Sequence, residues 1–405
     1  MKRFLVPALV LLAACSQTPV APTVPRLEPQ FGSAAKDFGV DAASASAGRV
    51  YVLSEQEGVR YDRAAGDNSV YEDAYLRRYD GNGSLAWSRQ IASVSCYEQD
   101  DYCVRSLRAQ TLVADAGGSS YALVLDASWG VQDCAAVTTY RVYKYGAAGN
   151  LVRTVNLGEN GYSFGGDSGP AFTPASDLAA DGGGNLYVVR QQAVFSDDYC
   201  DAARTDVVTK YAATGGLQWQ RLSPVGTLYG VSVSGNGHVY VAGSTGVAKY
   251  TGSGTLVWTK AGAAQDVAAV GSNTVYTRNL TAIRKLDGNG KQLWSRTQSG
   301  LTGLAIGDMT ADGGADVYLT GKYNASGSNR DVFTRKLSAR GGATLFTKTF
   351  GTAAYDDAEG IATLDGTEIY LTGETQASLG PAYQGGESDA FLRKLNASGT
   401  SVWTR

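Results

Sequence analysis

The sequence predicts an all-β fold, a seven-bladed β-propeller of four-stranded antiparallel blades, on two observations. One four-strand phrase recurs seven times along the 405 residues and covers almost the whole chain. A repeat of about 35–60 residues with four short strands is typical of a propeller blade. Gly is abundant (51) and Pro scarce (9), as expected where tight turns join many short strands.

Three residue columns define the phrase. The second strand of the repeats carries Tyr51, Tyr121, Tyr187, Tyr240, Tyr276, Tyr318 and Tyr370. The third strand carries Arg78, Lys144, Lys210, Lys249, Lys285, Lys336 and Lys394. The fourth strand carries Trp87, Arg153, Trp219, Trp258, Trp294, Phe346 and Trp403. Because side chains alternate faces along a strand, each column points the same way in every blade.

The columns are interpreted as packing rather than as a ligand site. Aromatic rings at one depth of every blade fill the wedge between neighbouring sheets, and repeats bury their core only against neighbours. A platform for stacking sugars or bases would need these rings exposed. The cation column is expected to snorkel along the strand or to form ion pairs between blades. Arg153 breaks the aromatic column, and the sequence offers no functional reason for it.

The amino terminus predicts export and a lipid anchor. Lys2 and Arg3 precede an apolar segment, too short to span a bilayer permanently, that ends LAAC at Cys15. These letters resemble the lipobox of bacterial lipoproteins, which implies acylation of Cys15; a plain secretory signal is the alternative. Ser16, rather than Asp, favours the outer membrane by the same resemblance, and which side of the membrane the protein faces stays open. The expected divisions are a signal peptide at 1–14, an acylated Cys with a Pro-rich tether at 15–30, and the propeller at 31–405.

Composition narrows the partners. The formal net charge is −3, and a mildly acidic surface argues against nucleic acid as the main partner. No cofactor or metal is expected, because no CxxC occurs and the single His, His238, lies in a turn. The expected partner is a protein or glycan of the cell envelope, bound by a monomer that contacts the membrane through its N-terminal lipid.

Four further cysteines predict two disulfides in an exported chain. They are Cys96, Cys103, Cys134 and Cys200. In an up-and-down blade, the connection between the second and third strands emerges on the same face as the connection to the next blade. All four thiols fall in such connections, so we expect them on one face over adjacent blades. Three pairings are possible, and position favours Cys96–Cys103 and Cys134–Cys200.

The same face carries insertions in neighbouring repeats. Between the Tyr and cation columns, repeats 4 and 5 use nine residues, repeat 6 uses 18, and repeats 7, 1, 2 and 3 use 23 to 27. The insertions are acidic and aromatic, and long loops on a rigid scaffold are where binding usually lies. Longer hairpins or surface decoration are the alternative. The candidate ligand-face residues are Tyr97, Asp100, Asp101, Tyr102, Trp129, Asp197, Asp198 and Tyr199.

The last repeat reads FGTAAYDDAEGIATLDGTEIYLTGETQASLGPAYQGGESDAFLRKLNASGTSVWTR. This text resembles the bacterial β-propeller repeat family of SBBP type, and repeats 6 and 7 match its pattern best. The resemblance implies a seven-bladed propeller in an exported or surface protein, and it implies no catalytic residues. Outer-strand text such as KYTGSGTLVW is also similar to quinoprotein-type repeats, a group that includes an outer-membrane assembly scaffold lipoprotein. That group typically has eight blades, and no quinone or calcium ligand set is recognisable.

These features favour a non-catalytic binding or scaffold module whose ligand surface is the face with the long loops of blades 7, 1, 2 and 3. The alternative is a propeller enzyme, a lyase or hydrolase acting on envelope or extracellular glycans through paired carboxylates. Its candidate acids and bases are Asp100, Asp101, Asp197 and Asp198. Such acidic runs are usually solvated, and no GxSxG motif occurs, so no catalytic residue is assigned. A rigid spacer is a third hypothesis.

The two ends of the chain predict a closed ring. Residues 31–37 repeat the phrase of residues 350–356, so the last strand leads into the first repeat. Whether one blade combines strands from both ends depends on which strand is innermost, which the sequence does not decide.

Overall fold

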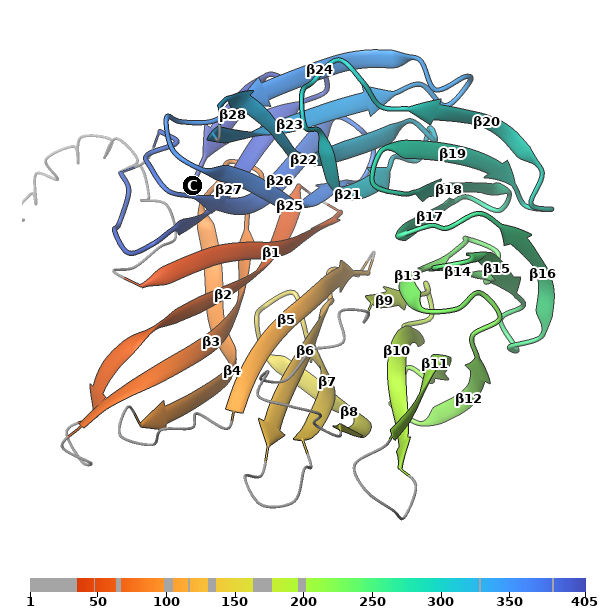
Figure 1. Cartoon of the computed structure of the whole chain (residues 1–405), viewed down its shortest axis with the longest axis horizontal. Coiled ribbons are helices and arrows are strands. Elements are labelled where there is room, and N and C mark those ends of the chain that lie inside the picture. The colour runs from red at the N-terminus through yellow and green to blue at the C-terminus, as the bar shows by residue number, and fades with distance from the viewer. Residues whose placement is uncertain are drawn as a thin grey trace, which may run out of the picture.

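The computed structural model describes residues 35–46, 48–62, 67–97, 105–115, 117–129, 136–162, 177–195, 202–327, 329–380 and 382–405. These residues form seven four-stranded antiparallel sheets around a central axis and contain no helix (Figure 1). The predicted seven-bladed propeller is therefore confirmed.

Each blade is built from four consecutive strands, and the first of each four lines the central channel. The innermost strands are β1 (Lys36–Ala45), β5 (Arg105–Ala114), β9 (Asp177–Ala180), β13 (Leu228–Val233), β17 (Asp266–Val270), β21 (Ala305–Ala311) and β25 (Asp356–Thr363). The second strands are β2 (Arg49–Asp62), β6 (Ser120–Trp129), β10 (Leu186–Phe195), β14 (Val239–Gly243), β18 (Thr274–Arg278), β22 (Val317–Ser326) and β26 (Glu368–Thr375).

The third and fourth strands complete each blade toward solvent (Figure 1). The third strands are β3 (Asp67–Tyr79), β7 (Ala136–Tyr145), β11 (Ala202–Tyr211), β15 (Gly246–Tyr250), β19 (Ala282–Asp287), β23 (Asn329–Leu337) and β27 (Asp389–Asn396). The outer strands are β4 (Leu85–Tyr97), β8 (Leu151–Tyr162), β12 (Leu217–Leu222), β16 (Leu256–Ala261), β20 (Gln292–Thr297), β24 (Thr344–Phe350) and β28 (Ser401–Thr404).

Burial follows the position of a strand within its blade. β14, second from the axis, is buried at every residue, and its sequence VYVAG is apolar throughout. β12, at the outer edge, is exposed at every residue except Trp219. A strand covered on both faces reads as a continuous apolar run, whereas a solvent-facing strand keeps apolar residues only where it packs inward.

The Tyr column packs between blades, as the sequence predicts. All seven rings are at most 1 % exposed. Tyr187 lies 6.1 Å from the Trp219 ring of its own blade, and Tyr276 lies 5.7 Å from Trp294. Tilted aromatic pairs at this spacing add about 0.5–1.5 kcal/mol beyond area burial. A stacking platform for ligands is excluded for this column, because the rings are inaccessible.

The Trp and cation columns bind one shared carbonyl in the next blade. In blade 3, Lys210 Nζ and Trp219 Nε1 donate to Gly252 O of blade 4, at 3.0 and 3.1 Å. The same pair of donors meets the equivalent carbonyl at four other junctions: Arg78 with Trp87, Lys249 with Trp258, Lys285 with Trp294, and Lys394 with Trp403. Each junction is thus held by a charged and a neutral hydrogen bond at the turn end.

The cation column corrects one expectation. Between blades its members bind carbonyl oxygens, and the ion pairs they form lie within a blade, as with Lys336–Asp316 at 3.1 Å. Six of the seven also lie over the Tyr ring of their own blade, as with Lys144 at 4.8 Å from the Tyr121 centroid. A carbonyl dipole and a ring face both stabilise a half-buried cation without a second charge.

Arg153 replaces Trp without losing this contact. Its Nη1 donates to Ala213 O, the blade 3 carbonyl at the same place in the turn. The guanidinium therefore supplies the donor that indole Nε1 supplies in the other blades, which gives the break in the column a structural reason.

The ring closes without a blade of mixed strands. Blade 1 contains β1–β4 and blade 7 contains β25–β28. Lys394 and Trp403 of blade 7 donate to Gly81 O of blade 1, at 2.7 and 3.2 Å. At the other face of the same junction, the Asp37 N–H donates to Ser388 O at 2.8 Å. The first and last blades therefore meet through the same paired contact that is found at four other junctions.

Candidate functional site

The two faces of the ring differ in regularity. We call the side with the tight turns between third and fourth strands the turn face, and the opposite side the hairpin face. In blade 4 the second and third strands stop pairing at Ala242↔Val247. In blade 1 they continue to pair as far as Asp62↔Asp67, and the long strands extend well beyond the ring (Figure 1). The insertions of blades 1, 2 and 3 are therefore extended hairpins.

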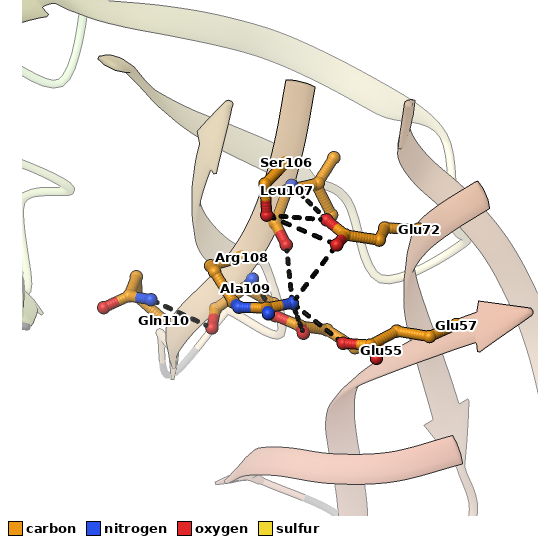
Figure 2. Close-up of polar contacts among 8 residues, drawn as sticks. All are labelled: Glu55, Glu57, Glu72, Ser106, Leu107, Arg108, Ala109 and Gln110. Atoms are coloured by element: carbon orange, nitrogen blue, oxygen red, sulfur yellow. Dashed lines mark hydrogen bonds and ion pairs between the residues drawn. The ribbon is translucent and has the colours of Figure 1, made fainter. Parts of the chain in front are cut away.

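A charged cluster fixes the base of the blade 1 hairpin to blade 2 (Figure 2). Arg108 on β5 lies 2.9 Å from Glu57, 3.4 Å from Glu55 and 3.8 Å from Glu72. Ser106 Oγ donates to Glu72 at 2.9 Å, and the Ala109 N–H donates to Glu55. The hairpin thus leaves the ring from a rigid base.

Burial dominates the chemistry of Glu55. This side chain is 3 % exposed, and desolvation raises its pKa to about 8, against the attraction of Arg108. The raised pKa favours the protonated form of Glu55, and Glu57 and Glu72 also face Arg108. The cluster is suited to holding two blades together, since its carboxyls are already engaged by backbone and guanidinium donors.

A groove lies between this hairpin and blade 7. Its volume is about 580 Å³, and it is bounded by Gly58, Val59, Val70 and Tyr71 of blade 1 and by Glu387 of blade 7. Val59 is 59 % exposed and Val70 is 40 % exposed, so two neighbouring apolar side chains face solvent across paired strands. An apolar floor with charged edges can bind an extended chain.

Four aspartates surround the central channel. They lie ten residues before the Tyr column: Asp41, Asp177, Asp266 and Asp308. Three of them accept a backbone N–H from the innermost strand of the next blade: Asp41 from Leu112 at 2.7 Å, Asp177 from Val231 at 2.8 Å and Asp308 from Ile361 at 2.8 Å. The ring of carboxylates therefore joins blades at the axis.

The pKa values of these aspartates are raised by burial. Desolvation raises the pKa of Asp41 to about 6 and that of Asp177 to about 7. The pKa of Asp308 is raised well above its ordinary value by burial and by the charge of Asp41. Burial also raises the pKa of Asp266, although the positive charge of Arg278, 3.1 Å away, opposes this shift. Four carboxylates that share one narrow channel cannot all ionise cheaply.

A cavity of about 160 Å³ opens above this ring toward the hairpin face, with Glu359 and Gln265 in its wall. Glu359 neighbours a polar cluster between blades 6 and 7. Lys322 Nζ bonds Asp357, and Tyr355 OH donates to the same carboxylate at 3.0 Å. Glu359 is exposed in β25, and partial desolvation at the channel mouth together with the Asp357 charge raises its pKa to about 7. This cluster therefore holds a titratable carboxyl beside a cation at the channel mouth.

Most of the predicted site residues lie outside the described residues. This holds for Cys15, Cys103, Cys134, Cys200, Asp100, Asp101, Tyr102, Asp197, Asp198 and Tyr199. Cys96 and Tyr97 end β4, and Trp129 ends β6, so the backbone of all three lies at the hairpin face. The disulfide pairings stay predictions.

The channel aspartates, which sequence reasoning missed, could have been recognised by their spacing from the Tyr column. Asp41 and Asp177 precede Tyr51 and Tyr187 by ten residues each, as do Asp266 and Asp308 in their blades, so they form a fourth column. Arg108, in contrast, lies in no column, and nothing in its sequence context relates it to Glu55.

Comparisons with known proteins identify no family for this chain. No protein-family model matches the chain, and no curated protein matches it. Solved structures with a similar arrangement include a protein of unknown function from Bacteroides caccae, with 11 % identity, a TM-score of 0.42, and coverage of 65 % of this chain and 89 % of that one. Another is the Neurospora crassa Pan2 WD40 domain, with 8 % identity, a TM-score of 0.44, and coverage of 84 % and 86 %.

Two features are absent from the part of the chain that the structure describes. No group of three or more His, Cys, Asp or Glu side chains there is arranged to hold a metal ion. None of these residues belongs to a helix long and apolar enough to cross a membrane.

Proposed function

We propose that this protein is a lipid-anchored propeller of the cell envelope that acts as a non-catalytic binding or scaffold module. A β-propeller fold is consistent with such a role. The ligand surface we propose is the hairpin face over blades 7, 1, 2 and 3. The observation that carries this is the groove of about 580 Å³ at Val59 and Val70, between the blade 1 hairpin and blade 7.

The groove favours an extended partner, a polypeptide segment or a glycan chain. Val59 and Val70 offer apolar contact, while Lys36, Glu57 and Glu387 at the edge offer hydrogen bonds and charge. The charged cluster around Arg108 holds the hairpin in place before a partner arrives. Such preorganisation lowers the entropy cost of binding.

The test is a binding screen with matched variants. The mature chain with Cys15→Ser is probed against immobilised envelope glycans and separated envelope proteins. The Val59→Ser/Val70→Ser variant alters the groove, and Leu345→Ser/Val402→Ser alters exposed aliphatic residues elsewhere on the ring. We expect a partner that the wild type and the second variant bind and the first does not. A partner retained equally by all three proteins would place the ligand surface elsewhere.

The anchor is tested separately. Cells expressing the full chain are fed an alkyne-tagged fatty acid, and the purified protein is examined for the label. We expect label and membrane association in the wild type and neither in Cys15→Ser. An unlabelled, secreted wild type would show that the first residues form a plain secretory signal.

A glycan-acting enzyme is the second candidate, and the cluster at the channel mouth is what favours it. A general acid must hold a proton near neutral pH, and the pKa of Glu359 is raised to about 7 beside Lys322 and Tyr355. Neutral and uronate-containing glycans would be incubated with the wild type and Glu359→Gln, and new reducing ends or unsaturated products measured. Turnover that Glu359→Gln abolishes would support the enzyme; no turnover on the whole panel would leave binding as the function.

A further inference from the structure

The outer edge of the ring exposes aliphatic side chains at the same position in successive blades. Of the fourteen large hydrophobic residues that are exposed among the described ones, nine occupy the first two positions of an outer strand, immediately after the turn. Three consecutive blades are the richest. Their exposed residues are Leu151 and Val152 on β8, Leu217 and Leu222 on β12, and Leu256 and Val257 on β16. Exposed aliphatics gathered in this way mark an interaction surface more often than scattered ones do.

The first five positions of the outer strands carry cations and no acidic residue. The first five positions of the outer strands read LAWSR, LVRTV, LQWQR, LVWTK, QLWSR, TLFTK and, with the terminal Arg, SVWTR. Each copy holds one Arg or Lys and none holds Asp or Glu, in a chain whose formal net charge is −3. The acidic residues are therefore concentrated elsewhere, and this edge is cationic.

Apolar and cationic positions are ordered along each strand. In blade 4, Leu256 and Val257 begin the strand, and Lys260 follows about 10 Å further along. Arg221 in blade 3 lies 5.7 Å from the Trp219 ring centroid and donates to Gly254 O, so its charge stays close to the edge. A band of aliphatics beside a band of cations is the pattern of interfacial membrane contact.

We propose that the outer edge of blades 2, 3 and 4 rests against an anionic lipid bilayer. This patch is defined by Leu151, Val152, Arg153, Leu217, Arg221, Leu222, Leu256, Val257 and Lys260. The inference goes beyond the proposed function. Of that function it assumes only the location of the protein at the cell envelope. A second copy of the chain fits this patch poorly, because two such edges would bring like charges together.

The tether permits this orientation. Cys15 and the first described residue, Ala35, are twenty residues apart, and a chain of that length spans up to about 70 Å when extended. Since β1 begins at the hairpin face, an anchor at Cys15 allows the ring to turn its edge to the bilayer and leaves the groove at Val59 accessible.

The experiment uses vesicle co-sedimentation of the mature chain with Cys15→Ser, so that no acyl chain contributes. The vesicles are phosphatidylglycerol with phosphatidylethanolamine, or phosphatidylcholine alone. The patch variant is Leu151→Ser/Val152→Ser/Leu256→Ser/Val257→Ser, and the charge variant is Arg221→Gln/Lys260→Gln. Leu345→Ser/Val402→Ser changes equivalent positions on blades 6 and 7 and is the control. Circular dichroism confirms the fold of each protein.

We expect binding to anionic vesicles at least about tenfold stronger than to phosphatidylcholine, and weaker at high salt. The patch and charge variants should each lose most of it, while the control keeps it. Failure of the folded wild type to bind anionic vesicles would overturn the proposal, as would an equal loss in the control. Self-association that the patch variant abolishes would assign the edge to a second copy instead. None of these outcomes depends on a groove ligand, so the proposed function is tested independently.

Discussion

Blade 4 and blade 1 make the same contacts at the turn face and differ in the length of their strands at the hairpin face. In blade 4 the strands β14 and β15 have five residues each, and in blade 1 β2 and β3 have 14 and 13. At the turn end both blades donate two side-chain hydrogen bonds to one carbonyl of the next blade. The length of a hairpin is therefore independent of the contact that closes the ring.

This comparison separates a half of the molecule that builds the ring from a half that is free to vary. Every junction that uses the shared carbonyl lies at the turn face, and the groove, the channel-mouth cluster and the extended hairpins lie at the hairpin face. Each repeat buries its core only against its neighbours, so the turn half tolerates little change.

Removing a turn-end aromatic ring should be the most damaging change. Trp219 packs on Gly254, which has a φ of +83°. A Cβ at this position would lie 2.7 Å from Trp219 Cδ2, so only glycine leaves room for the ring. We expect Trp219→Ala to lower the free energy of unfolding by about 3–5 kcal/mol in urea titrations. Trp219→Phe is the matched control, since blade 6 has Phe346 there, and should cost only the hydrogen bond, about 1 kcal/mol. Equal costs would show that the ring itself contributes little.

The channel aspartates should make the protein less stable as pH rises. Burial raises the pKa of Asp177 from 3.8 to about 7, so the folded state holds this proton more tightly than the unfolded state does. The resulting stabilisation is complete below about pH 4 and is lost as pH rises through about 7. Urea unfolding from pH 4 to 8 should therefore show a decline that Asp177→Asn flattens, because an amide does not ionise.

The surface carboxyl Glu387 provides the control for this pH series. Glu387→Gln should leave the slope of stability against pH as it is in the wild type. If Asp177→Asn and the wild type decline in parallel, the proton lost in this range belongs to another group, with Asp41 and Glu359 the next to test.

Arg153 should be replaceable by the residue that its column otherwise carries. Arg153→Ala removes the donor to Ala213 O and should cost about 1–3 kcal/mol, the range for a charged hydrogen bond. Arg153→Trp restores the indole donor and should change the free energy of unfolding by less than about 1 kcal/mol. A tryptophan variant as unstable as the alanine variant would mean that blade 2 has adapted to the guanidinium.

The sequence was most informative where the structure is repetitive. Tyr240, Lys249 and Trp258 recur in register, so their shared role in packing could be predicted from alternation along strands. The shared carbonyl could not, because a backbone acceptor in the next blade leaves no mark on the sequence. Nor could the approach of Arg108 to Glu55, which depends on the angle at which β5 lies against β2. A contact that occurs at only one junction between blades forms no repeated pattern, so it cannot be predicted from the sequence.

Shortening the blade 1 hairpin should have the smallest effect on stability. Deleting residues 60–69 leaves Gly58, Val59, Val70 and Tyr71 to connect the Glu57↔Glu72 pair, as four residues connect the strands of blade 4. The turn-end bonds and the cluster around Arg108 are kept, so the free energy of unfolding should change by less than about 1 kcal/mol. Partner binding through the groove should fall, because Val59 and Val70 would then belong to the connecting turn and would no longer face solvent across paired strands. A large loss of stability instead would mean that the hairpin half also holds the ring together, and the division between the two faces would fail.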